Sequence, residues 1–174
     1  MTGLTDSEAT IRILVALGIG ALIGLEREWR NKSAGFRTYA LVCEGSALFM
    51  ITGILIYDQV RNAGGGISDP SRIASTVVQG IGFIAGGLIF AAGSRVHGLT
   101  TAAGIWVTSA LGLLIGAGFF HIAIVGAAAT FVTLGFLGYV DRFISPSSKN
   151  PYVGHSNSNL EPDNNPDSDQ NEHS

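Results

Sequence analysis

Glu44 is the one acidic residue inside the long apolar run 39–57. A carboxylate within a bilayer costs about 2.5–3.5 kcal/mol on insertion scales, so such residues often handle ions or protons or bind a partner. The structural alternative is a neutral or paired carboxyl that hydrogen-bonds to hydroxyls on neighbouring helices. By its depth along the run, the candidate partners of Glu44 are Thr101, Trp106 and Thr108, with Gln79 and Ser109 lying deeper.

A second group of ionisable residues fills the connection 25–38, between two apolar runs. It holds two anions and four cations, namely Glu26, Glu28, Arg27, Arg30, Lys32 and Arg37. A cationic connection between membrane-length apolar runs is typical of the cytoplasmic side of a bilayer protein. The stretch either anchors the chain at the lipid headgroups or presents a recognition surface to a partner.

Other chemistry finds little support in the residues. The single cysteine excludes an internal disulfide, and the four histidines lack the spacing of metal ligands. The glycine-rich segment 80–86 follows no predicted strand, so it is not a dinucleotide fingerprint. No nucleophile is paired with a base. We therefore expect no enzyme, no cofactor and no metal centre.

Five apolar runs must position these residues. They cover residues 9–25, 39–57, 73–92, 98–117 and 121–140. All five prolines fall outside them, as expected for unbroken helices. With 47% hydrophobic and only 13% charged residues, the chain lacks the charge of a typical water-soluble domain. The composition predicts an all-α protein with five transmembrane helices, bound to lipid and not to nucleic acid.

The distribution of Lys and Arg predicts the orientation. With the N-terminus outside, the inner side holds Arg27, Arg30, Lys32, Arg37, Arg95, Arg142 and Lys149, and the outer side holds Arg12, Arg61 and Arg72. Positive residues favour the inside, so we expect an extracytoplasmic N-terminus and a cytoplasmic C-terminus. From residue 145 onward the chain is rich in Ser, Asn, Asp and Pro, which predicts a disordered acidic tail over 145–174 after a membrane domain over 1–144.

Glycines recur at spacings that let helices approach closely in lipid. Gly20 and Gly24 lie four residues apart in the first run, and Gly82 and Gly86 repeat the spacing in the third. At these four positions we expect another helix to pack closely, whether it belongs to the same chain, to a second copy or to a partner protein. Thr100 and Thr101 lie near the start of the fourth run, where we expect their hydroxyls to cap the free N–H groups of the helix. The alternative is an anion-binding site at this helix N-terminus.

Several ordered motifs resemble the MgtC/SapB family. The resemblance rests on residues 17–30, 34–38, 45–49, 80–89 and 98–112 and spans about 12–140. The matching positions are Gly24, Glu26, Arg27, Arg37, Thr38, Gly82, Gly86, Thr100 and Thr101. Glu44 departs from the family pattern, which carries a neutral residue there. The acidic tail replaces the soluble C-terminal domain of longer members.

The resemblance implies a bacterial inner-membrane protein linked to growth at low magnesium, to survival inside host cells and to inhibition of the ATP synthase. The first hypothesis is therefore a regulator that packs its helices against a membrane partner. The second is a magnesium or other cation carrier, or a subunit of one, that uses Glu44. The candidate functional or contact residues are Glu26, Arg27, Arg30, Arg37, Thr38, Glu44, Gly20, Gly24, Gly82, Gly86, Thr100 and Thr101.

Overall fold

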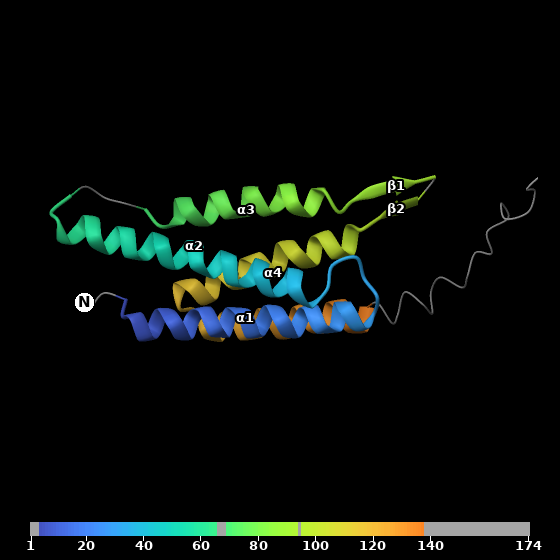
Figure 1. The fold of residues 1–174 in the computed structure, drawn as a ribbon, viewed down its shortest axis with the longest axis horizontal. Coiled ribbons are helices and arrows are strands. Elements are labelled where there is room, and N and C mark those ends of the chain that lie inside the picture. The colour runs from blue at the N-terminus through green and yellow to red at the C-terminus, as the bar shows by residue number, and fades with distance from the viewer. Residues whose placement is uncertain (1–3, 66–68, 94, 138–174) are drawn as a thin grey trace, which may run out of the picture.

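The computed structural model describes residues 4–65, 69–93 and 95–137, which form a helical bundle and a β-hairpin (Figure 1). In chain order the elements are α1 (Asp6–Trp29), α2 (Phe36–Asn62), α3 (Ser71–Gly86), β1 (Phe90–Ala92), β2 (Arg95–His97), α4 (Leu99–Ala117), α5 (Phe120–Val132) and the π-helix η1 (Thr133–Leu137). The five predicted helices are present in the predicted order. The acidic tail lies outside the described residues.

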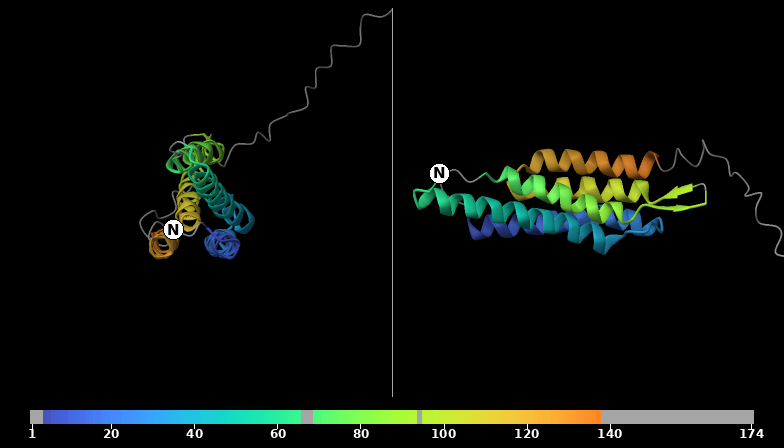
Figure 2. Two further views of the ribbon diagram at one scale, coloured as in Figure 1. Left: turned by 90° about the vertical axis from the view of Figure 1, so that its left-hand side faces the viewer. Right: turned by 90° about the horizontal axis from the view of Figure 1, so that it is seen from above.

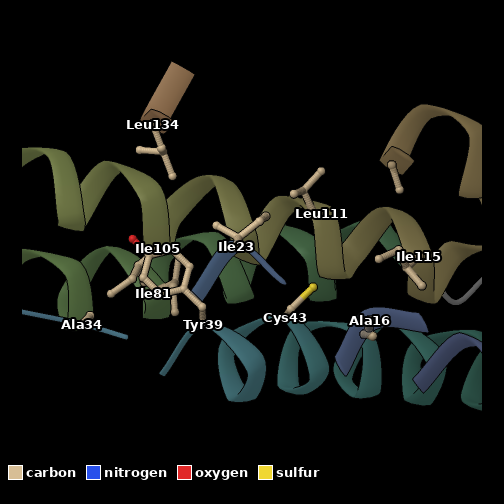
Figure 3. Close-up of a cluster of buried hydrophobic side chains, with 12 residues drawn as sticks. Ala16, Ile23, Ala34, Tyr39, Cys43, Ile81, Ile105, Leu111, Ile115 and Leu134 are labelled. Carbon is tan, nitrogen blue, oxygen red and sulfur yellow. The ribbon is translucent and has the colours of Figure 1, made fainter. Parts of the chain in front are cut away.

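Helix α4 lies at the centre of the bundle and contacts α1, α2, α3 and α5 (Figure 2). Its Ile105, Thr108, Ser109 and Ile115 are fully buried. Apolar side chains from the other helices pack around it, and Figure 3 shows Tyr39 and Ile105 among the buried side chains of this core. The central helix is therefore the element that the others are positioned against.

Three helices have the length and composition to cross a membrane: α1, α2 and α4. Their 24, 27 and 19 residues correspond to about 36, 40 and 28 Å, against a hydrocarbon core of roughly 30 Å. Helix α3 has 16 residues, and the apolar stretch Phe120–Phe136 is also shorter. We expected five full membrane spans, and three of the helices are long enough to be such spans.

Large apolar side chains cover the outside of the bundle. Leu14, Leu22 and Leu41 are 61%, 62% and 66% exposed, and Phe83 of α3 is 87% exposed. Extended apolar surfaces of this kind are uncommon on water-soluble monomers. They suit helices whose outer faces meet lipid, as the composition predicted.

The β-hairpin corrects one sequence prediction. The third helix was expected to continue to residue 92, but α3 ends at Gly86, and β1 pairs with β2 through Ala91 and Val96. Consecutive glycines at 86 and 87 weaken the helix there. Hydropathy did not reveal this end, because apolar residues continue through the first strand.

The hairpin also changes the start of α4. Gly98 is the N-cap and adopts a left-handed φ of +86°, where an added Cβ would clash with the carbonyl of Leu88. No side chain caps this helix through its N-cap residue. The capping expected from Thr100 and Thr101 is also not seen, because neither hydroxyl accepts a hydrogen bond from a backbone N–H of the described residues, and that of Thr101 lies opposite Ser33.

The Arg- and Lys-rich connection between α1 and α2 lies at one end of the bundle, which we call the basic end. There α1 ends, α2 begins, α3 leads into the hairpin and α4 begins, so the connection 30–35 and the hairpin lie at the same end (Figure 1). At the opposite end, Arg12 of α1 donates a hydrogen bond from Nη1 to the carbonyl of Gly116 at 2.7 Å. A cation is favourable at this C-terminal turn of α4 because the helix dipole is negative there.

Candidate functional site

The last turn of α1 holds a compact ion cluster at the basic end. Arg27 donates from Nε to Glu26 Oε2 at 2.5 Å and from Nη2 to Glu26 Oε1 at 2.8 Å. Arg30 Nε lies 2.5 Å from the same Oε1 atom. The cluster, defined as Glu26, Arg27 and Arg30, therefore shares one carboxylate between two guanidinium groups and carries a net positive charge.

Burial separates the two arginines. The side chain of Arg27 is 2% exposed, whereas that of Arg30 is 36% exposed. A buried guanidinium is tolerated only when its charge is paired and its donors are bonded. Arg27 meets this condition through Glu26, which lies next to it in the sequence. Arg30 pairs with the same carboxylate at the surface, where part of its guanidinium group is exposed.

The cluster also fastens the end of the described chain to α1. Arg27 Nη2 donates to the carbonyl of Leu134 at 2.9 Å, and Arg30 Nη2 donates to that of Gly135 at 3.0 Å. Both acceptors belong to η1, where carbonyls near a helix C-terminus attract cations. The two arginines thus join segments more than 100 residues apart.

Glu28 serves the start of α2, a role that sequence reasoning did not assign. The N-cap of α2 is Gly35, which has no side chain to accept from the free N–H groups. Glu28 Oε2 instead accepts from the N–H of Phe36 at 2.8 Å. A carboxylate at a helix N-terminus is stabilising because it bonds an otherwise free donor and complements the helix dipole. In the sequence, a glycine directly before an apolar run could have indicated that a nearby acidic residue caps the helix.

Gly20 and Gly24 bring α1 against α2. A Cβ added at Gly20 would lie 2.5 Å from the carbonyl oxygen of Tyr39, and one at Gly24 would lie 2.7 Å from Cα of Phe36. Both distances are too short for any side chain. The close helix approach that the spacing predicted therefore occurs for these two glycines inside the chain.

Tyr39 and Thr101 extend this contact to α4. The hydroxyl of Tyr39 donates to the carbonyl of Thr101 at 3.3 Å, and Ser33 Oγ lies 3.4 Å from Thr101 Oγ1. Thr101 is buried, whereas its neighbour Thr100 is exposed. The two threonines therefore have different surroundings, although we predicted the same role for both from the sequence.

The remaining candidates lie apart from the ion cluster. Arg37 is exposed and Thr38 half-buried in the first turn of α2, and neither makes a side-chain hydrogen bond within residues 4–65, 69–93 and 95–137. Gly82 and Gly86 lie on the exposed side of α3. The structure thus joins Glu26, Arg27 and Arg30 and leaves these four separate.

Glu44 is half-buried on α2 and forms no hydrogen bond or ion pair with any described residue. None of the partners expected on α4 forms a hydrogen bond with it in the described part of the chain. The reason is its angle around α2: Cys43 faces the core, and the next residue is rotated by about 100°. Matching depth along two helices was therefore insufficient to predict contact.

A hydrogen bond between α2 and α4 was also missed. Ser46 Oγ and Ser109 Oγ lie 2.8 Å apart and are both buried, and Ser46 also donates to the carbonyl of Val42. Hydroxyls commonly join helices within a bilayer. In the sequence, two serines at similar depth in two membrane-length runs could have indicated this hydrogen bond between helices.

Two grooves follow the helices. The first, of about 500 Å³, lies between α4 and the α5–η1 segment and includes Thr100 and Thr133. The second, of about 680 Å³, lies between α2 and α3, and its walls carry Gly45 and Gly80. Both are lined mainly by apolar side chains. Within the described ranges, no three His, Cys, Asp or Glu residues gather as metal ligands would.

The amino-acid sequence matches one protein family and several curated proteins. The sequence model of the MgtC family matches residues 13–143. The putative magnesium transporter YhiD of Escherichia coli is 47% identical over 122 residues, which are 70% of this chain and 56% of that protein. Protein MgtC of Salmonella typhimurium is 40% identical over 124 residues, 71% of this chain and 48% of the relative.

The uncharacterized protein slr0014 of Synechocystis is 40% identical over 139 residues, covering 80% of this chain and 56% of the relative. The chain thus spans about half the length of these curated relatives. No solved structure matches it.

Proposed function

Because this chain belongs to the MgtC family, we propose that it is a membrane regulator that packs a helix face against a membrane partner in magnesium or energy homeostasis. The first partner to test is the ATP synthase, which the family resemblance implies. The proposal concerns recognition within the bilayer and assigns no chemical step to the chain.

The groove between α2 and α3 is the observation that carries this proposal. Its lining is almost entirely apolar, and a Cβ added at Gly45 or Gly80 would meet no other atom within 4 Å. Small residues let a second helix approach the backbone closely in lipid, where packing drives association. Leu41, Phe49 and Ile84 provide apolar contact area around the two glycines.

The charges support an orientation in which the basic end faces the cytoplasm of a bacterial inner membrane. Among the described residues, Arg27, Arg30, Lys32, Arg37 and Arg95 lie at this end, and Arg12, Arg61 and Arg72 lie toward the other. Short loops rich in Lys and Arg remain on the cytoplasmic side. The N-terminus is then extracytoplasmic, and the partly exposed side chain of Arg30 faces the cytoplasmic side.

Filling the groove tests the proposal. Gly45→Leu and Gly80→Leu are each expected to reduce recovery of ATP synthase subunits with the tagged protein from native membranes by about tenfold, because leucine occupies the partner's space. Gly18→Leu is the matched control, since a Cβ added at Gly18 also meets nothing within 4 Å, but Gly18 lies on α1, away from the groove. Quantitative mass spectrometry of the purified complexes measures the recovery.

A parallel readout is ATP-driven proton pumping in inverted vesicles, which the unmodified protein should inhibit and the two groove variants should not. Equal recovery of synthase subunits with all variants and with an unrelated membrane protein would refute the proposal. Specific recovery of a different protein would reject the ATP synthase as the partner.

A second function is favoured by Glu44 and by the printed description of YhiD as a putative magnesium transporter. Glu44 is a half-buried carboxylate with no bonding partner among the described residues, on a helix long enough to span a bilayer. If the chain is a cation carrier, Glu44→Gln should abolish magnesium uptake into sealed proteoliposomes. Uptake equal to that of empty liposomes for the unmodified protein would exclude this function for the chain on its own.

A further inference from the structure

One side of α3 carries a line of small and polar residues that nothing in the described chain covers. Ser75, Gln79, Gly82 and Gly86 are all exposed. Their spacing of four, three and four residues places them on one side of the helix, as in the seam of a coiled coil. We call these four residues the α3 seam. The buried residues Ile81 and Ala85 lie on the other side, toward the bundle.

The glycines of the α3 seam differ from those that pack inside the bundle. A Cβ added at Gly112 or Gly116 of α4 would lie 2.2 or 2.7 Å from a carbonyl oxygen of α2. At Gly82 and Gly86 the same atom would meet nothing within 4 Å. The seam glycines therefore serve no close helix contact within the described chain.

Gln79 is a second, independent observation. Helix α3 lies alongside α2 and α4, which are long enough to span a membrane (Figures 1 and 2). Gln79 is near the middle of α3, about 12 Å from its first residue and about 10 Å from its last, so we expect its exposed amide at the depth of the hydrocarbon. It makes no hydrogen bond with any described residue. Lipid tails cannot supply one, and an unpaired amide in hydrocarbon is costly.

We propose that the α3 seam is the interface of a homodimer, in which Gln79 of one copy bonds Gln79 of the other. A side-chain amide both donates and accepts, so it complements itself across a twofold axis. Copies inserted in the same orientation share an axis along the membrane normal, which makes the paired α3 helices parallel. Gly82 and Gly86 then allow the backbones to approach closely.

This interface is separate from the groove proposed for the partner. Gly80 and Ile84 line that groove, whereas the four seam residues do not. Dimerisation can therefore be present when partner recovery fails, and the two proposals can fail independently.

Cysteine cross-linking in native membranes locates the interface. In a Cys43→Ala background, Ser75→Cys and Gly82→Cys are expected to give, on oxidation, a product of twice the 18.1 kDa chain mass. Val77→Cys and Ile84→Cys, on the groove side of the same helix, should give little. Equal cross-linking at all four positions, or none, overturns the proposal. A seam product with the mass of another protein assigns the face to that protein and also overturns it.

The association equilibrium tests the role of each residue. Fluorescence energy transfer between labelled copies in liposomes, measured against protein-to-lipid ratio, should show dimerisation weakened about tenfold by Gln79→Leu and at least as much by Gly82→Leu. Gln79→Asn should retain most of the association, because it keeps an amide. Gly18→Leu should have no effect. Dimerisation unaffected by Gln79→Leu and Gly82→Leu would refute the α3 seam as the interface.

Discussion

Glu26→Gln is expected to lower the free energy of unfolding by about 3–5 kcal/mol, the usual cost of removing one partner from a buried ion pair. The reason is the burial of Arg27, whose side chain is 2% exposed and takes both of its carboxylate contacts from Glu26. Glutamine keeps the size of the side chain but removes the charge. Arg27 would then have only neutral acceptors among the described residues, namely the amide oxygen of the new glutamine and the carbonyl of Leu134.

A double-mutant cycle distinguishes this explanation from a simple loss of packing. The double variant Glu26→Gln, Arg27→Met removes both charges, so its cost should be clearly smaller than the sum of the two single costs. Denaturant unfolding in detergent micelles, followed by helix content, measures each value. Arg37→Met is the control, because Arg37 is exposed and should change stability by less than about 0.5 kcal/mol. Additive costs would contradict the assigned pairing.

Gly20→Ala and Gly18→Ala are expected to have opposite effects, although the residues lie two positions apart on α1. At Gly20 the new methyl group would lie 2.5 Å from the carbonyl oxygen of Tyr39 and 2.7 Å from Cβ of Cys43, so α1 must move away from α2. Overpacking of this kind costs about 1–3 kcal/mol. At Gly18 nothing lies within 4 Å, and alanine favours the helix by up to about 1 kcal/mol.

Thermal unfolding of the two variants in the same detergent measures this difference. Gly20→Ala should lower the transition temperature, and Gly18→Ala should leave it unchanged or raise it. Gly20→Leu should enlarge the loss, since the added carbons meet backbone atoms that cannot rotate away. Equal transition temperatures for Gly18→Ala and Gly20→Ala would show that α1 and α2 do not approach as closely as the structure has them.

The comparison of glycines shows where sequence reasoning reaches its limit. The spacing of Gly20 with Gly24 is the same as that of Gly82 with Gly86, and it predicted helix contacts for both pairs. In the structure the first pair packs against α2, while the second faces outward on α3. Spacing identifies a smooth side of a helix but does not indicate what covers it, because that depends on how the helix is rotated within the bundle.

The ion cluster shows the same division. A connection rich in Arg, Lys and Glu was predictable, and so were Glu26, Arg27 and Arg30 as candidates. The acceptors on η1 were not, since Leu134 and Gly135 are ordinary apolar-run residues whose backbone carbonyls do the bonding. For Glu44 the sequence suggested partners that the structure does not show. Its depth along α2 matched residues of α4, but its position around α2 differs from that of the core-facing Cys43.

Composition and motifs were enough to predict five apolar helices, their order, the accumulation of cations at one end and the family. These properties follow from composition and local periodicity, which do not depend on neighbouring elements. The central place of α4, the pairing of β1 with β2, and the burial of Arg27 but not of Gly82 became visible only in the folded arrangement. Those features depend on the rotation and contact of helices far apart in the chain, and most outer and inner positions here are equally apolar, so hydropathy could not distinguish them.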